Sequence, residues 1–309
     1  MARKRKGLKI DGWIIVDKPR GMTSTQVIGR VRRATRAAKL GHGGTLDPEA
    51  TGLLPIALGE ATKTIAWCQD GTKIYRVTVC WGEATATEDA EGEIIETSTV
   101  RPDKQAIRDA LPAFIGTISQ MPPIFSALKV NGQRAYDLAR KGEIPELKAR
   151  DVVIEALSLV GIVDADHATF EVVCGKGTYI RSLARDLARN LGTVGHVRDL
   201  RRTRVGPFLE TMAICLDKLD EYGNEPPPFG ALLPVETALD DIPALAITEN
   251  EAHLLRQGRP VEAPGVCNGT CQVRTDQDLV AIGEVKEGSL RSLRVFNLNQ
   301  KRESDVDHS

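Results

Sequence analysis

The sequence predicts a protein that combines β-strands with α-helices in one large domain and adds a small β-rich domain after it. The chain has 309 residues, which exceeds the usual size of a single domain. Strand-like and helical spacings of apolar residues both occur before residue 230. Three consecutive prolines at 226–228 cannot continue a helix or an inner strand, so they indicate a linker and a boundary near residue 230.

The first sixty residues predict a strand, a helix, a loop and a second strand. Residues 12–16 form a short apolar run that ends in a turn, which is typical of a strand. Thr23 or Ser24 then caps a helix whose apolar residues recur at helical spacing and whose remaining face carries arginines. Residues 41–48 contain three glycines and a proline, which predicts a loop. The apolar run at 53–58 predicts a buried strand.

The rest of the chain continues the mixture of elements. Tyr75 shares one face of a predicted strand at 73–81 with the apolar Val77 and Val79. An acidic, threonine-rich stretch follows and predicts a surface excursion at 83–99. Helical spacing predicts helices at 106–114 and 180–191. Further strands are expected at 152–163, 169–174, 279–285 and 292–296, and a disordered polar tail at 299–309.

The charge of the chain is balanced overall but not locally. The 41 basic and 42 acidic residues give a formal net charge of −1, which does not by itself favour nucleic-acid binding. Residues 1–41, however, contain twelve lysines and arginines against two aspartates, a local excess of ten positive charges. Such a segment is suited to a polyanionic partner.

Cysteine spacing and hydropathy exclude several classes of protein. The six cysteines are scattered, which fits neither a disulfide framework nor a four-ligand zinc site, so we expect no metal. No run approaches the roughly 20 apolar residues that span a bilayer. These observations predict a reduced, cytoplasmic protein without a membrane partner.

The loop GHGGTLDPEATG at 41–52 is the first candidate for chemistry. It places Asp47 between glycines and a proline, where backbone approaches a ligand closely and the residue before proline is held extended. The alternative is a turn-forming Asp-Pro pair. Neither a P-loop nor a G-x-G-x-x-G pattern is present, which argues against nucleotide hydrolysis.

Five motifs stand in order between residue 12 and about residue 210. They are DKPRGMTS (17–24), GHGGTLDPEATGLLPIALGEATK (41–63), KIYRV (73–77), MPPIFSALKVNGQRAYDLARKG (121–142) and KGTYIRSLARDLA (176–188). Together they resemble the TruB family of tRNA pseudouridine synthases, of the bacterial type. One departure is Gly43-Gly44-Thr45, where many bacterial members have Thr-Gly-Ala, but the spacing from His42 to Asp47 is intact.

The resemblance implies a fold and a reaction. The implied fold is α+β, with a mixed, largely antiparallel sheet flanked by helices over residues 1–230 and a PUA-like RNA-binding domain at 231–298. The implied reaction converts a uridine of the TΨC loop, at position 55 of tRNA, into pseudouridine after base flipping. It needs no metal or organic cofactor. The implied partner is the TΨC stem-loop of tRNA, and no obligatory protein partner is implied.

The resemblance also assigns three catalytic residues. The family's catalytic aspartate falls on Asp47, and Arg181 matches the arginine that pairs with it. Tyr75 matches the tyrosine that stacks on the flipped base and takes part in removing the C5 proton. From the residues alone, Arg181 also fits a solvated arginine stripe, and Tyr75 also fits packing against Val77 and Val79.

Further residues are expected to contact the RNA. Lys18, His42 and Leu200 match substrate-binding positions, although a solvated lysine, a loop histidine without a role and a core leucine are the alternatives. Basic faces on the first predicted helix and around residue 200 are expected to track phosphates. A solvated surface is the alternative for both. The expected RNA-binding residues are Arg30, Arg33, Arg198, Arg201 and Arg202.

Two rival functions use parts of the same pattern. A noncatalytic tRNA-binding or RNA-chaperone protein needs the basic faces but not Asp47, Tyr75 and Arg181. A glycosidase needs a pair of acids around the bond, and Glu49 is the nearby candidate. Zinc-dependent deamination is disfavoured because the H-x-E and P-C-x-x-C signatures are absent.

Overall fold

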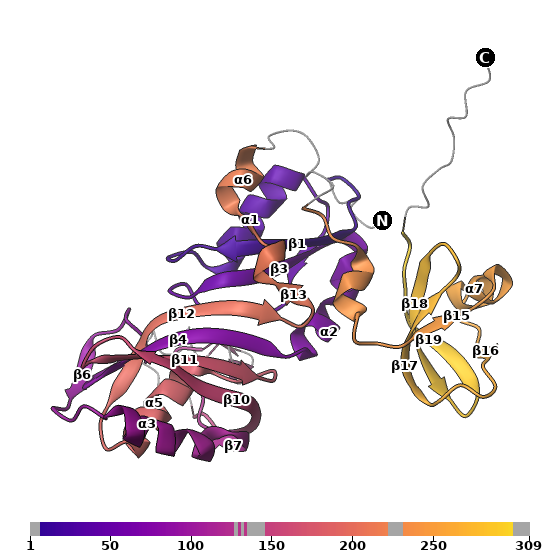
Figure 1. Cartoon of the computed structure of the whole chain (residues 1–309). Helices are drawn as coiled ribbons and strands as arrows, with labels where there is room; N and C mark the ends of the chain where they lie inside the picture. The colour runs from indigo at the N-terminus through magenta and orange to yellow at the C-terminus, as the bar shows by residue number, and fades with distance from the viewer. Residues whose placement is uncertain (1–6, 127–128, 131–132, 135–145, 222–230, 299–309) are drawn as a thin grey trace.

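The computed structural model describes residues 7–126, 129–130, 133–134, 146–221 and 231–298. It confirms the expected α+β class: a large mixed sheet with helices against it is followed by a small β-rich domain (Figure 1). The prolines at 226–228, the tail at 299–309 and much of the motif at 121–142 lie outside the described residues. No helix in the described ranges is both long and apolar enough to cross a membrane.

The large sheet is mostly antiparallel, as expected. Its parallel pairs are β1 with β14 and β3 with β12, while its other pairs run antiparallel. Two short strands, β2 (Leu40–His42) and β13 (Phe208–Leu209), attach to β3 and β12. The main path runs through β14 (Ile214–Cys215), β1 (Gly12–Lys18), β3 (Thr51–Leu58), β12 (Gly195–Val205), β4 (Lys73–Trp81), β11 (His167–Cys174), β10 (Arg150–Ile162) and β7 (Gly116–Gln120).

Strand β12 lies in the middle of this sheet, yet simple alternation of residues does not predict it. Its pairing with β4 shifts register between Val197 and Asp199 and again between Arg202 and Arg204. Each bulge turns the following side chains to the other face, so the strand has no continuous period of two. The arginine-rich stretch around residue 200 is an inner strand between β3 and β4, in which Arg198 is exposed and Arg202 is buried.

In the described part of the chain, one face of the sheet packs against α1 (Ser24–Thr35), α3 (Lys104–Ala110), α5 (Ile180–Asn190) and α6 (Leu216–Glu221). In α1, Thr23 caps the first turn through a capping box with Gln26. Other elements of this domain are η1 (Gly59–Thr64), α2 (Ile65–Asp70), β5 (Glu83–Thr85), β6 (Ile94–Thr97), η2 (Leu111–Phe114), β8 (Lys129–Val130), β9 (Gln133–Arg134) and η3 (Glu210–Met212).

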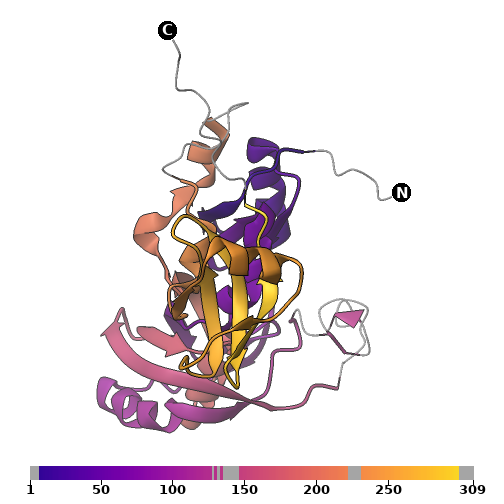
Figure 2. The ribbon, with the colours of Figure 1, turned by 90° about the vertical axis from the view of Figure 1, so that its right-hand side faces the viewer.

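The other face of β1 and β3 packs against the C-terminal segment (Figures 1 and 2). Trp13 is fully buried there, stacks at 5.1 Å from Phe208 and exchanges two 2.8 Å backbone hydrogen bonds with Leu233. After η4 (Val235–Leu239), a five-stranded sheet runs in the order β15 (Ala244–Ala246), β17 (Gly269–Arg274), β18 (Leu279–Lys286), β19 (Ser289–Val295), β16 (Val261–Glu262), with α7 (Glu249–Arg256) packed on it. Because both of its faces are buried, β1 is a continuous apolar run.

A close backbone approach at Gly52 joins β3 to β12. Gly52 has a φ of +98°, and a Cβ there would meet the Arg202 carbonyl oxygen at 2.3 Å. Gly116 has nearly the same φ, +97°, but a Cβ there would meet nothing within 4 Å. The two glycines therefore separate backbone strain from steric overlap.

We predict that Gly52→Ala is much more destabilising than Gly116→Ala. Both substitutions carry the strain of a positive φ, about 1–3 kcal/mol, and Gly52→Ala adds an overpacking cost of about 1–3 kcal/mol. Urea unfolding of the two variants measures the difference in the free energy of unfolding. Equal destabilisation would show that β3 and β12 move apart without cost.

Candidate active site

The loop between β2 and β3 carries Asp47, and hydrogen bonds from Gly21 and Ser24 hold this loop in place. The Ser24 hydroxyl donates to the Leu46 carbonyl and accepts from the Leu46 N–H, each at 3.0 Å. The Gly21 N–H donates to the Pro48 carbonyl at 2.9 Å. The residues on both sides of Asp47 are therefore fixed by hydrogen bonds, while the Asp47 side chain itself remains 38% exposed.

Arg181, in the first turn of α5, supplies a cation beside that carboxylate. Its Nε lies 2.9 Å from Asp47 Oδ2, although the N–H is not aligned as in a hydrogen bond. Its two terminal nitrogens donate to the carbonyls of Thr87 and Phe125, each at 2.9 Å, and Nη1 lies 3.7 Å from Asp89 Oδ2. The guanidinium is thus buried and held by several groups, which excludes the solvated-stripe alternative.

Asp47 and Arg181 line a cavity of about 620 Å³ together with Tyr75 and Leu200. This volume lies within the range of small-ligand sites. Arg202, which was expected at the RNA backbone, also lines this cavity. The structure therefore brings together five of the expected site residues, from the loop, from α5, from β4 and from β12. Which of them contacts a substrate stays a prediction.

Tyr75 forms part of the cavity wall from the middle of β4. Burial raises the pKa of its phenol, and the neighbouring Arg202 guanidinium opposes part of that rise. The phenol is consequently neutral near neutral pH. Its ring is accessible from the cavity, although the strand also packs Val77 and Val79 into the core.

Tyr179 lines the same cavity and was not among the expected site residues. The Gln120 side chain fixes its backbone by accepting from the Tyr179 N–H at 2.8 Å and donating to the Tyr179 carbonyl at 3.1 Å. Burial raises the pKa of the Tyr179 phenol. The signal for this residue was its place in the KGTYIR motif, two positions before Arg181.

Lys18 is not among the residues that line this cavity. Its side chain is fully buried, and its ammonium donates to the carbonyls of Pro19, Met22 and Pro48 at 2.8–2.9 Å. Burial lowers its pKa to about 8, although the charge of Asp47 opposes the shift. Lys18 therefore stabilises the turn and the Asp47 loop from below, which differs from the expected contact with substrate.

His42 is likewise not among the residues that line the cavity, although the next residue, Gly43, is. It is in β2, and its Nδ1 accepts a 3.2 Å hydrogen bond from the Gly44 N–H. Burial and then the charge of Arg202 lower its pKa, so the imidazole is neutral near neutral pH. The structure leaves its proposed stacking role as a prediction.

The five expected RNA-binding arginines have different environments. Arg33 and Arg198 are exposed, and Arg30 lies 3.5 Å from the Asp217 carboxylate. Arg201 makes a two-pronged contact with Asp17 at 2.9 and 3.0 Å and a 2.7 Å bond with Glu210.

Arg202 differs most from the expected surface contact. Its side chain is 2% exposed, and its guanidinium donates to backbone carbonyls inside the domain. The expectation that Arg202 tracks phosphates is therefore not supported by its position.

Among the described residues, one group of three side chains could hold a metal ion. The ligand atoms of Cys80, Glu83 and His196 all lie within 4.8 Å of one another. However, His196 Nδ1 bonds to the Glu83 carbonyl at 2.8 Å, and burial raises the pKa of the Cys80 thiol, as does the Glu83 charge. The expectation that the protein holds no metal stays a prediction.

Comparison with known proteins identifies the family. The model for the TruB family pseudouridylate synthase N-terminal domain matches residues 32–180, and the model for the tRNA pseudouridylate synthase B C-terminal domain matches residues 181–240. The chain belongs to the TruB family. The tRNA pseudouridine synthase B of Rhodospirillum rubrum is 52% identical over 308 residues, covering 96% of this chain and 100% of that protein. The protein of the same name from Caulobacter vibrioides is 52% identical over 311 residues, with the same coverage.

Solved structures support the fold of this TruB family member. A chain in the structure of an H/ACA RNP bound to a substrate RNA containing 2′-deoxyuridine has a TM-score of 0.72 and 24% identity, covering 96% of this chain and 91% of that chain. A chain in a Cbf5-Nop10-Gar1 complex has a TM-score of 0.70 and 26% identity, with coverages of 92% and 84%. The likeness extends over both domains.

The environment of Lys18 predicts a dependence of stability on pH. Its pKa is about 8 in the folded protein and about 10.4 in an unfolded chain, so between these values the folded state binds fewer protons. The free energy of unfolding should therefore rise with pH across this window, by up to about 3 kcal/mol. Urea unfolding of wild type and Lys18→Met between pH 7 and 10 measures the difference, which should grow in favour of wild type.

Lys176→Met is the matched control for this measurement. Lys176 has a side chain that is 69% exposed, and it pairs with Asp70 at the surface. Its substitution should leave the difference from wild type nearly flat with pH. A flat difference for Lys18→Met as well would show that the Lys18 ammonium is solvated.

Proposed function

We propose that this protein isomerises a uridine of the TΨC loop of tRNA, at position 55, to pseudouridine, with Asp47 as the catalytic carboxylate. The observation that carries the proposal is the contact of 2.9 Å between Asp47 and the buried Arg181, at the wall of a cavity that Tyr75 and Leu200 also line. The names of the relatives support the choice of tRNA as the substrate.

The shape of the site supports base flipping. Asp47 faces a cavity and not an open surface, so a base held in a folded RNA loop must leave its stack to reach the carboxylate. Leu200 is 9% exposed and offers an apolar wall, while Tyr75 offers an aromatic ring. Stacking of a base on such a ring contributes about 1–3 kcal/mol, which offsets part of the cost of unstacking.

The reaction is an isomerisation that the side chains in the cavity can carry out. The bond from C1′ to N1 breaks, a bond from C1′ to C5 forms, C5 loses its proton and N1 gains one. No electrons or groups are exchanged with a second molecule. Asp47 acts either as the nucleophile at C1′ or as the base that leads to a glycal, and in both routes it acts ionised beside Arg181.

The neutral phenol of Tyr75 limits how it can act. Because burial raises its pKa, a standing phenolate is not available to take the C5 proton near neutral pH. Stacking needs no change of ionisation. Proton removal by Tyr75 requires that the phenol passes its own proton on in the same step.

The exposed arginines suit capture of the tRNA backbone. Arg33 projects from α1, and Arg198 borders a small hollow that also contains Asp47 and Glu49. These two residues and Arg30 are the proposed phosphate contacts. Arg201 already has two carboxylate partners, so we give it a smaller share of binding. We propose that the C-terminal domain acts as a PUA-like RNA-binding domain.

We predict that Asp47→Asn abolishes pseudouridine formation while tRNA still binds. The amide keeps the size of the side chain but loses the charge, and a loss of about 10²- to 10⁴-fold or more in the single-turnover rate is expected. The measurement is pseudouridine in an unmodified tRNA transcript, with tRNA affinity measured in parallel. Substantial turnover by the variant would remove Asp47 from the chemistry.

Glu49→Gln is the matched control. Glu49 is the neighbouring acid in the same loop, and it lies 4.0 Å from Arg20. The control should retain activity. Release of free uracil that depends on both acids would instead support a glycosidase, and tRNA binding without any product would support a noncatalytic RNA-binding or chaperone role.

We further predict that Tyr75→Phe and Tyr75→Leu separate stacking from proton transfer. Phe keeps the ring, so it should bind tRNA normally, whereas Leu should weaken capture of the flipped base. If the hydroxyl relays the C5 proton, Phe should slow tritium release from C5-labelled uridine in a single turnover. Full activity of both variants with lowered melting temperatures would assign Tyr75 to the core alone.

A further inference from the structure

A buried arginine lies directly beneath the Asp47 loop. Arg202 is on β12, between β3 and β4, and its side chain is 2% exposed. Its Nε donates to the Leu53 carbonyl at 2.9 Å, and its terminal nitrogens donate to the carbonyls of Thr45 at 3.2 Å and Gly44 at 3.0 Å. Its donors therefore face the loop and β3.

This position is energetically demanding. Burying a guanidinium costs free energy, and here all three acceptors are neutral carbonyls and not carboxylates. A lysine could not replace it, because a single ammonium cannot reach three carbonyls that are spread along a planar fork. The guanidinium of Arg202 thus connects the loop, two and three residues before Asp47, to β3, the strand that follows the loop.

Arg202 also sets the charge inside the cavity. It is the cross-strand partner of Tyr75, and its charge lowers the pKa of the Tyr75 phenol against the larger effect of burial. The same charge lowers the pKa values of His42, Lys18 and Lys73. The buried guanidinium of Arg202 thus holds the loop that carries Asp47 and lowers the pKa of the Tyr75 phenol in the same cavity, against the larger effect of burial.

We propose that Arg202 is a positioning residue for the isomerisation, which holds the Asp47 loop at a fixed depth against Tyr75. This inference rests on the proposed function. Arg202 reaches Asp47 through the backbone at Gly44 and Thr45, so a loss of the fork displaces the carboxylate. A displacement of about 1 Å at a reacting group can lower a rate about 100-fold.

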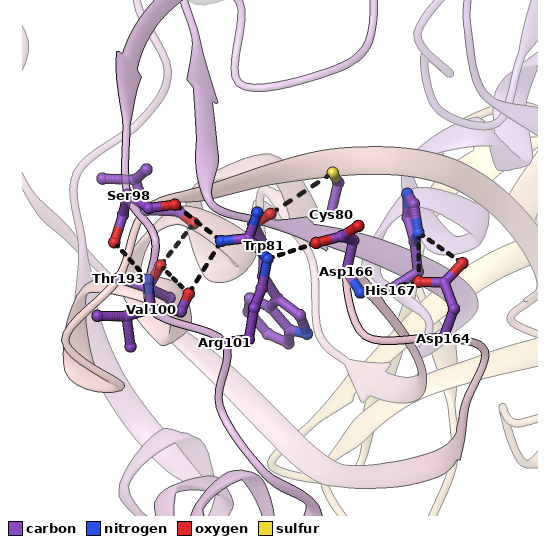
Figure 3. A network of polar contacts seen from close by, with 10 residues as sticks. Cys80, Trp81, Ser98, Val100, Arg101, Asp164, Asp166, His167 and Thr193 are labelled. Carbon is purple, nitrogen blue, oxygen red and sulfur yellow. Dashed lines mark hydrogen bonds and ion pairs between the residues drawn. The ribbon is translucent and has the colours of Figure 1, made fainter.

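The test compares Arg202→Lys with Arg101→Lys. Arg101 is a matched control because its guanidinium also holds carbonyls, those of Ser98 at 2.7 Å and Val100 at 3.1 Å, and it pairs with Asp166 (Figure 3). It does not line the cavity. For each variant, the dissociation constant of an unmodified tRNA transcript, the single-turnover rate at saturating protein and the melting temperature are measured.

We expect Arg202→Lys to lower the single-turnover rate by about 10- to 100-fold while the dissociation constant changes less than about twofold. Arg101→Lys should leave both quantities near wild type, even if its melting temperature falls equally. A weaker tRNA affinity with an unchanged rate would overturn the proposal and return Arg202 to the RNA contacts. Normal values of both, or an equal loss of rate in Arg101→Lys, would also overturn it.

Gly44→Ala tests the same contact from the loop side and decides the matter if Arg202→Lys does not fold. Gly44 has a φ of +135°, and a Cβ there lies 3.6 Å from Arg202 Nη1. That distance is an ordinary contact, so the strain comes from the positive φ, at the residue whose carbonyl Arg202 holds. The rate should again fall without a loss of affinity. A normal rate would overturn the proposal. Absence of pseudouridine with wild-type protein would instead refute the proposed function, so the two failures are distinguishable.

Discussion

The pairing of β12 with β3 and β4 is the constraint on which the rest of the structure depends. To one side of β12 lie β3, β1 and β14, and to the other lie β4, β11, β10 and β7. The register against β3 is set by Thr51 with Arg201 and Gly52 with Arg202, immediately after the Asp47 loop. Any side chain at Gly52 would separate these backbones. The two halves of the sheet are therefore joined where the Asp47 loop enters β3. The contacts that join these halves also fix the position of the cavity.

Three buried or nearly buried cations surround the loop, and they act in different ways. Lys18 and Arg202 bind carbonyls on either side of Asp47, whereas Arg181 approaches its carboxylate directly. The contacts of Lys18 and Arg202 with carbonyls fix the backbone of the loop, and neither cation forms an ion pair with Asp47 through them. Arg181 contacts the carboxylate itself at 2.9 Å. The backbone of the loop and the side chain of Asp47 are thus held by separate groups.

The sequence was sufficient for elements with a regular period and for residues with a motif. The strand at 73–81 and the helix from Ile180 have uninterrupted patterns, and the structure confirms both. Strand β12 could not be found this way because its two bulges break the alternation. Lys18 was expected at the substrate because of its motif, and Arg202 at the RNA because it lies in a basic cluster. Their burial depends on loop carbonyls that need donors, which a linear pattern does not reveal. Tyr179 lies in the KGTYIR motif, but only the cavity distinguishes it from the neighbouring residues of that motif.

Burial of β1 on both faces has a consequence for how the chain unfolds. Trp13 and Ile15 face η4 and the second sheet, while Ile14 and Val16 face α1. The C-terminal segment cannot detach without exposing the apolar side chains of β1 and β3 that it covers. We therefore expect the two domains to unfold together, and a chain truncated after α6 to aggregate.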